Sequence, residues 1–248
     1  MQTTNYSASA RHVPKPDEAA LPRVFGNPSE HLHHAQIDYV GFGNNVTLKA
    51  ASGALTFAQE RLAAIDELRA NPHPEDKPAT HARKVREATA NFDGVWNKKW
   101  DDGKAALQDE RKRVAADLNA KAGLKPVDRH FDAITATFYN MKPDERSKAI
   151  ASLIEEGDFP TLATLIDAPL LVTKLTSEQR DGIKLRVLMK VDPAGVALWD
   201  QLNRALEKWE NASFAAIRIR AKLLEGTDRF DKRANDAETV ASNIKSGF

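Results

Sequence analysis

The stretch PATHARKVREATANFDGVWNKKWDDGKAALQDERKRVAADLNAKA, residues 78–122, decides the fold of this chain. Pro78 favours the start of a helix, and Gly123 and Pro126 favour its end. The stretch therefore predicts one helix that runs to about Ala122. At 1.5 Å per residue such a helix spans roughly 65 Å, which is too long for a compact domain of this size.

Apolar side chains form one narrow stripe along this helix. The stripe consists of Val85, Thr89, Phe92, Trp96, Trp100, Gly103, Leu107, Val114 and Leu118. A long helix with a narrow stripe needs a partner helix. Residues from about Ser52 to the proline-rich stop at 71–74 predict a helix that folds back on it as a hairpin. That helix is too short to cover the whole stripe, so we expect another chain to cover the rest.

Residues 127–192 predict a bundle of short helices. The stretch GDFPTLATLIDAPLLVTKLT, residues 157–176, has two prolines and few charges, and Asp158 can cap a helix there. Thr176 and Gln179 form the pattern of a capping box that starts the next helix. Between these helices, a tight corner is expected to be filled by Leu170, Leu171, Val172 and Leu175.

Asp192-Pro193 predicts the start of a long C-terminal helix, which Gly226 ends. Its apolar stripe, spaced close to the coiled-coil period, contains Val196, Trp199, Leu202, Leu206, Trp209, Ala216, Ile219 and Leu223. A second apolar line contains Phe214, Ile217, Ala221 and Leu224. Two lines predict contact with more than one partner helix. Residues 228–245 predict a weaker helix.

The N-terminal residues carry different signals. Residues 1–30 hold four prolines and few bulky apolar residues, which is typical of an extended arm. The arm is either a disordered tail or a segment that lies along a neighbouring subunit, anchored by residues such as Phe25 and Tyr39. Residues 38–49, DYVGFGNNVTLK, predict a small hairpin.

Together these signals predict an elongated all-α protein with four parts. The parts are residues 1–50 (arm with a small hairpin), 51–126 (long helical hairpin), 127–192 (short-helix bundle) and 193–248 (long C-terminal helix).

The chain offers few residues for catalysis or for holding a cofactor or metal, and we predict none of these sites. It has no cysteine, which excludes disulfides, thiolate metal sites and a cysteine nucleophile. The cluster His31, His33 and His34 lacks the further ligands that a zinc site needs. Paired carboxylates lie on charged helix faces, and no serine stands in a nucleophile elbow. No secretory signal or membrane span is expected.

Net charge gives no general reason to expect nucleic-acid binding. The 36 basic and 35 acidic residues nearly balance, with a formal net charge of +1. Two basic clusters, residues 111–113 and 218–222, can touch phosphates, but acidic residues accompany both. A solvated helix face is their simpler interpretation.

One stretch resembles a known group of proteins. IASLIEEGDFPTLATLIDAPLLVTKLTSEQRDGIKLRVLMKVDPAG, residues 150–195, together with the helix that follows, resembles uncharacterised helical proteins encoded among the structural genes of tailed bacteriophages. The similar features are the Glu-Gly-Asp turn, the short helix ending in Ala-Pro, the LTSEQ helix start and the charged C-terminal helix. The resemblance implies a virion component of the head, the neck or the proteins ejected with the genome, made in the host cytoplasm, without catalytic residues.

We therefore expect a non-enzymatic assembly protein that forms a homo-oligomer and contacts other virion proteins. The interface residues expected are Phe25, Tyr39, Trp96, Trp100, Leu107, Val114, Trp199, Leu206 and Trp209. One alternative is a DNA-associated packaging or scaffolding factor. Another is an adaptor or chaperone that binds a helix of another protein.

Overall fold

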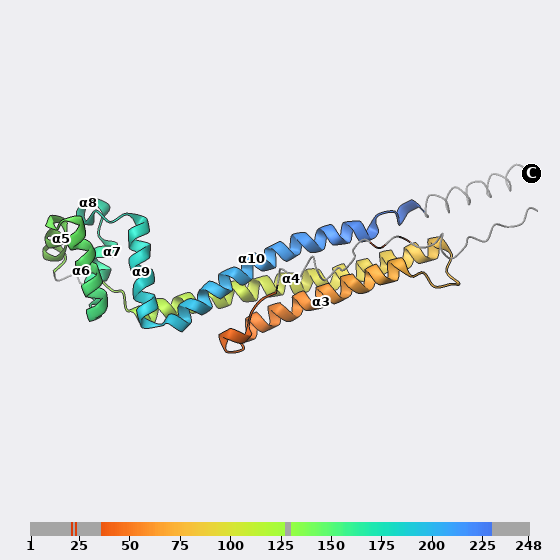
Figure 1. Cartoon of the computed structure of the whole chain (residues 1–248), viewed down its shortest axis with the longest axis horizontal. Helices are drawn as coiled ribbons and strands as arrows, with labels where there is room; N and C mark the ends of the chain where they lie inside the picture. Colours follow the sequence, from red (N-terminus) through yellow and green to blue (C-terminus); the bar gives the residue numbers. More distant parts are fainter. Residues whose placement is uncertain (1–20, 22, 24–35, 127–129, 230–248) are drawn as a thin grey trace, which may run out of the picture. The chain divides into compact units, whose positions relative to one another are not determined.

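The computed structural model describes residues 21, 23, 36–126 and 130–229. Within these ranges the chain is all-α, as the sequence predicted, with eight α-helices, one short 3-10 helix and no β-strand (Figure 1). The elements are η1 (Val40–Phe42), α3 (Val46–Ala70), α4 (Pro78–Ala122), α5 (Phe131–Asn140), α6 (Pro143–Glu156), α7 (Phe159–Asp167), α8 (Leu170–Thr173), α9 (Ser177–Val191) and α10 (Pro193–Leu224).

The chain divides into two compact units. The first unit contains Met1–Ile37, Lys49–Lys104 and Lys208–Phe248, and the second contains Asp38–Leu48 and Ala105–Glu207. Both α4 and α10 contribute residues to each unit. The four parts predicted from the sequence follow the order of the elements, whereas the compact units join segments that lie far apart in sequence.

The first unit is built from α3, the N-terminal part of α4 and the C-terminal part of α10, which lie side by side (Figure 1). Helices α3 and α4 form the predicted antiparallel hairpin, and a groove between them is lined by Phe57 and Val95 as well as by Leu68 and Ala88. Regularly spaced apolar side chains of all three helices are buried, among them Leu55, Leu62, Val85, Phe92, Ala216, Ile219 and Leu223.

A buried cluster of hydrogen bonds around Arg69 connects α3 to α4 and α10 in this unit. Arg69, at the end of α3, is 4% exposed, and its guanidinium donates to the carbonyl of Leu223 in α10. The Arg69 carbonyl accepts from the Leu21 backbone N–H at 3.3 Å and lies 3.1 Å from Nε2 of the buried His81. Arg23 pairs with Glu67. At these two described positions, residues 21 and 23, the predicted arm therefore lies against α3 of its own chain.

The hairpin predicted at residues 38–49 is wrong. Residues 40–42 form η1, and Gly43 and Asn44 adopt left-handed conformations with φ of 64° and 56°. The Asn45 side chain then accepts from the backbone N–H groups of Thr47 and Leu48, each at 3.1 Å. The Gly-Asn-Asn segment is thus the turn and cap that start α3, because asparagine tolerates the left-handed region and caps helices well.

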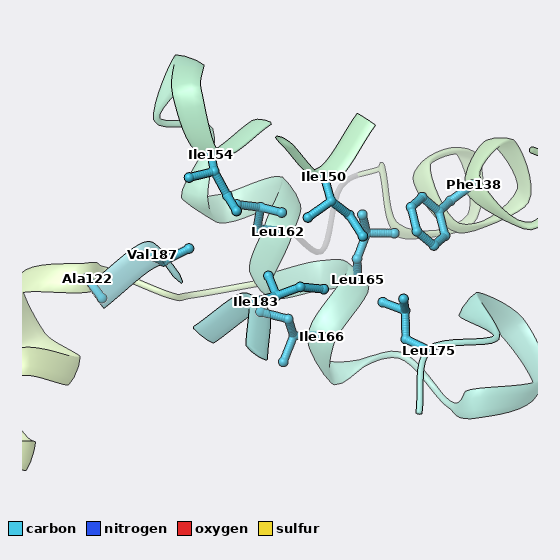
Figure 2. Close-up of a cluster of buried hydrophobic side chains, with 10 residues drawn as sticks. All are labelled: Ala122, Phe138, Ile150, Ile154, Leu162, Leu165, Ile166, Leu175, Ile183 and Val187. Carbon is cyan, nitrogen blue, oxygen red and sulfur yellow. The ribbon is translucent and has the colours of Figure 1, made fainter. Parts of the chain in front are cut away.

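The second unit contains the predicted bundle of short helices, α5 to α9. Its core brings together apolar side chains from α4, α5, α6, α7 and α9 and from the segment between α8 and α9 (Figure 2). The core residues are Ala122, Phe138, Ile150, Ile154, Leu162, Leu165, Ile166, Leu175, Ile183 and Val187. Helices α6 and α9 pack together and run parallel, since both line one groove with their N-terminal halves and Lys190 of α9 binds Glu155 near the end of α6.

Local capping chemistry sets where these helices begin. The Asp158 carboxylate accepts from the Thr161 N–H at 3.2 Å, and Thr176 and Gln179 form the predicted capping box. In both α6 and α9 an arginine of the second turn folds back on the chain before the helix. Arg146 Nε donates to the Met141 carbonyl and Arg180 Nε to the Leu175 carbonyl, each at 3.1 Å.

The prediction that Leu170 and Leu171 fill a buried corner is wrong. Leu175 is buried, but Leu170 and Leu171 are exposed, Leu171 to 87%. The chain forms the single turn α8 after Pro169, and this turn buries Thr173 rather than the two leucines. One helical turn can direct only part of its residues inward.

Candidate protein-docking surfaces

The stripe of α4 is covered by its own chain. Its residues Val85, Thr89, Phe92, Trp96, Leu107, Val114 and Leu118 are all buried. The expectation that another chain covers part of this stripe is therefore wrong. Helix α3 alone is too short to cover the stripe, but α10 packs along α4 as well. An ion pair between Arg220 and Asp93 and a hydrogen bond from Arg111 to Asn203 show α10 beside α4 within each unit.

Three of the four tryptophans expected at an interface, Trp96, Trp100 and Trp209, form an internal cluster in the first unit. The Trp209 ring stacks on Trp100 with centroids 4.8 Å apart and lies 6.1 Å from Trp96. Its indole N–H donates to the Trp100 carbonyl at 3.3 Å. Gly103 makes room for this ring, since a Cβ atom at that position would lie 2.5 Å from Cζ2 of Trp209. This cluster is core, so Trp96 and Trp209 present little surface to a partner.

The other candidate interface residues fall into three groups. Leu107, Val114 and Leu206 are buried in the second unit, and Tyr39 is half-buried beside η1. Phe25 lies outside the described residues. The histidines at 31, 33 and 34, which were considered as metal ligands, also lie outside them, as does most of the helix expected at 228–245. Among the candidates that the structure describes, Trp199 alone is exposed, at 37%.

Trp199 lies on an apolar groove of the second unit, between α4, α9 and α10. The groove has a volume of about 340 Å³ and is lined by Leu118, Leu188, Val196 and Leu185 along with Trp199. Leu185 is itself exposed. Leu185 was not identified from the sequence. It lies between the inward positions Ile183 and Val187 of α9, on the side of the helix that a bundle would leave to solvent.

The second apolar line of α10 is also exposed. In the first unit Phe214 is 65% and Ile217 56% exposed, while Trp209, Ala216 and Ile219 on the other side of the helix are buried. We call Phe214, Ile217, Ala221 and Leu224 the α10 strip. The sequence identified this strip, and the structure leaves its two largest exposed members without a covering helix among the described residues.

Charges around the two basic clusters are largely paired within the chain. Arg113 binds Glu110 at 2.7 Å, and its hydrogen bond lowers the pKa of that carboxyl. Arg220 lies 2.6 Å from Asp93, whose pKa is nevertheless raised because the carboxyl is partly buried. These ion pairs support the interpretation of both basic clusters as parts of solvated helix faces.

Among residues 36–126 and 130–229, no three acidic or histidine side chains gather closely enough to hold a metal ion. In the part of the chain that the structure describes, none of the helices combines the length and apolar character needed to cross a membrane.

Comparison of the chain with protein-family models, with curated proteins and with solved structures found no match.

Proposed function

We propose that this chain is a non-catalytic assembly protein that binds a second copy of itself through the α10 strip. The observation that carries the proposal is the exposure of Phe214 and Ile217 side by side on one helix face. Large apolar side chains that are exposed singly need no explanation, but a contiguous helical strip is typical of a docking surface.

Charge complementarity favours an antiparallel second copy. Glu210 precedes the strip, and its carboxylate, 54% exposed, binds Lys104 at 3.0 Å. Arg218 lies within the strip and donates only to the Phe214 carbonyl among described groups. When two copies of α10 cross antiparallel at Phe214, Glu210 of each faces Arg218 of the other. A parallel arrangement would instead place like charges together.

The expected strength follows from the side chains. Full burial of a Phe or Ile side chain contributes roughly 1.5–3 kcal/mol, and a two-fold contact buries two of each. Association itself costs an estimated 4–15 kcal/mol or more. The α10 strip therefore supports a weak association. The fraction of associated chains increases with local concentration, as in a larger assembly.

The finer proposal is a component of a tailed-bacteriophage virion. Its support is the resemblance of residues 150–195 to helical proteins encoded among phage structural genes, together with a strip suited to two-fold self-contact. A virion holds many copies at high local concentration, which is the setting where a weak symmetric contact is effective.

Sedimentation velocity over a concentration series up to several hundred micromolar tests the assembly proposal. We expect the average mass to rise with concentration for the wild type and to stay monomeric for Phe214→Asp. Leu171→Asp is the matched control, because it adds the same charge at an exposed leucine on α8. A wild type that stays monomeric throughout, or a Phe214→Asp variant that associates like it, would refute the proposal.

A further inference from the structure

A second groove, in the bundle of short helices, differs from the apolar surfaces in its charge. It lies between the N-terminal halves of α6 and α9 and has a volume of about 480 Å³, within the range of small-ligand sites. Its floor contains Ile150, Leu175 and Ile183, which are all buried. Its polar lining includes three cations, Arg146, Lys174 and Arg186, and among the described residues no carboxylate lines it.

The three cations are held in different ways. Arg146 donates from Nε to the Met141 carbonyl at 3.1 Å, which fixes the plane of its guanidinium and leaves the two Nη groups available. The Lys174 ammonium lies 3.9 Å from the centre of the Tyr139 ring, so it is held at the rim. Arg186 is exposed and forms no hydrogen bond or ion pair within the described residues, and Glu155 is near enough to act on it through its charge.

We infer that this groove binds a small oxyanion carried on an apolar body. Guanidinium groups recognise phosphate and carboxylate through paired N–H donors, and the apolar floor accepts the remainder of the ligand. Three cations and no carboxylate among the lining residues give the groove a local positive charge, which favours an anion. This inference is independent of the α10 strip, which belongs to the first unit.

Calorimetric titration of the full chain at low salt with phenyl phosphate and with benzoate tests the inference. Both probes carry an oxyanion on an apolar ring, and phenol is the control that lacks the charge. We expect saturable 1:1 binding of at least one anion and none of phenol. Tighter binding of phenyl phosphate would assign the natural ligand to phosphates, and tighter binding of benzoate would assign it to carboxylates.

Two pairs of variants locate the binding. Arg186→Gln should weaken it about tenfold, the effect of one charged hydrogen bond, whereas Lys148→Gln, on an exposed part of α6 outside the groove, should leave it unchanged.

Gly182→Leu should abolish binding by filling the groove, because a Cβ there meets no atom within 4 Å. Gly53→Leu, in α3 and equally unobstructed, is its control. Absence of saturable binding of either anion would overturn the inference, as would binding that Arg186→Gln and Gly182→Leu leave unchanged while both variants stay folded by circular dichroism.

Discussion

Replacing Gly103 by alanine tests the packing of the aromatic cluster. Alanine is normally the better helix residue, by roughly 0.5–1 kcal/mol in the free energy of unfolding. At Gly94, also within α4, a Cβ atom meets nothing within 4 Å. We therefore expect Gly94→Ala to stabilise the protein by about that amount.

At Gly103 the structure reverses the sign. The added Cβ would lie 2.5 Å from Cζ2 and 2.7 Å from Cη2 of Trp209. Carbon atoms pack at about 3.5–4.0 Å, so the ring must move by about 1 Å. Trp209 is fully buried and stacked on Trp100, which leaves it little room. Overpacking costs about 1–3 kcal/mol. After the gain in helix propensity, we expect Gly103→Ala to destabilise the protein by about 1–2 kcal/mol.

Urea unfolding followed by far-ultraviolet circular dichroism measures both variants without depending on tryptophan emission. The comparison uses one substitution in one helix, so propensity cancels and the difference of about 1.5–3 kcal/mol reports the contact with Trp209. Equal stabilisation by both substitutions would show that Trp209 does not lie against Gly103, and the description of the aromatic cluster would then be wrong.

Three further outcomes are expected. Leu206→Asp should destabilise the protein by several kcal/mol in urea unfolding, because it places an unpaired charge at a buried position. Trp209→Ala should cost about 3–5 kcal/mol, whereas Trp199→Ala should cost clearly less, because Trp209 is fully buried and Trp199 is 37% exposed. The Lys121 ammonium, and next the Gly195 N–H, lower the pKa of Asp192, so its stabilisation is present above the ordinary aspartate pKa of about 4 and is lost as pH falls through the lowered folded-state pKa. Melting temperatures from pH 7 to 2 should therefore converge for wild type and Asp192→Asn on the acid side, and a constant difference would contradict this assignment.

Helix boundaries were predictable because short-range chemistry sets them. Pro78 begins α4, and the chain turns after Ala122 at Gly123, whose φ is 58°. Thr176 and Gln179 sit three residues apart and satisfy each other's backbone groups whatever the tertiary fold. Such signals need no knowledge of distant residues.

The segment before α3 shows where short-range reasoning fails. Aromatic and β-branched residues beside Gly-Asn-Asn fit a hairpin turn and a helix cap equally well. The choice depends on tertiary partners of Asn45, whose amide also donates to Glu110 at 2.9 Å. That contact joins residues far apart in sequence, and no local sequence pattern predicts it.

The partner of the α4 stripe was unpredictable for the same reason. Trp100 and Trp209 were each predicted to be core or interface residues, but no sequence pattern predicts that their rings stack on each other. Gly103 appeared only as a gap in the stripe. Gly103 leaves space for the Trp209 ring. That role depends on the contact between α4 and α10, which only the fold defines.

The coverage of α4 changes the reason for expecting assembly. From sequence, Leu107 and Phe214 are equivalent: each is a large apolar residue on a line at helical spacing. The structure separates them, since Leu107 is fully buried by its own chain and Phe214 is 65% exposed. The length of α4 therefore gives no reason to expect a partner chain. The uncovered apolar surface is one side of α10, where the α10 strip and the nearby charges of opposite sign support the proposed contact with a second copy.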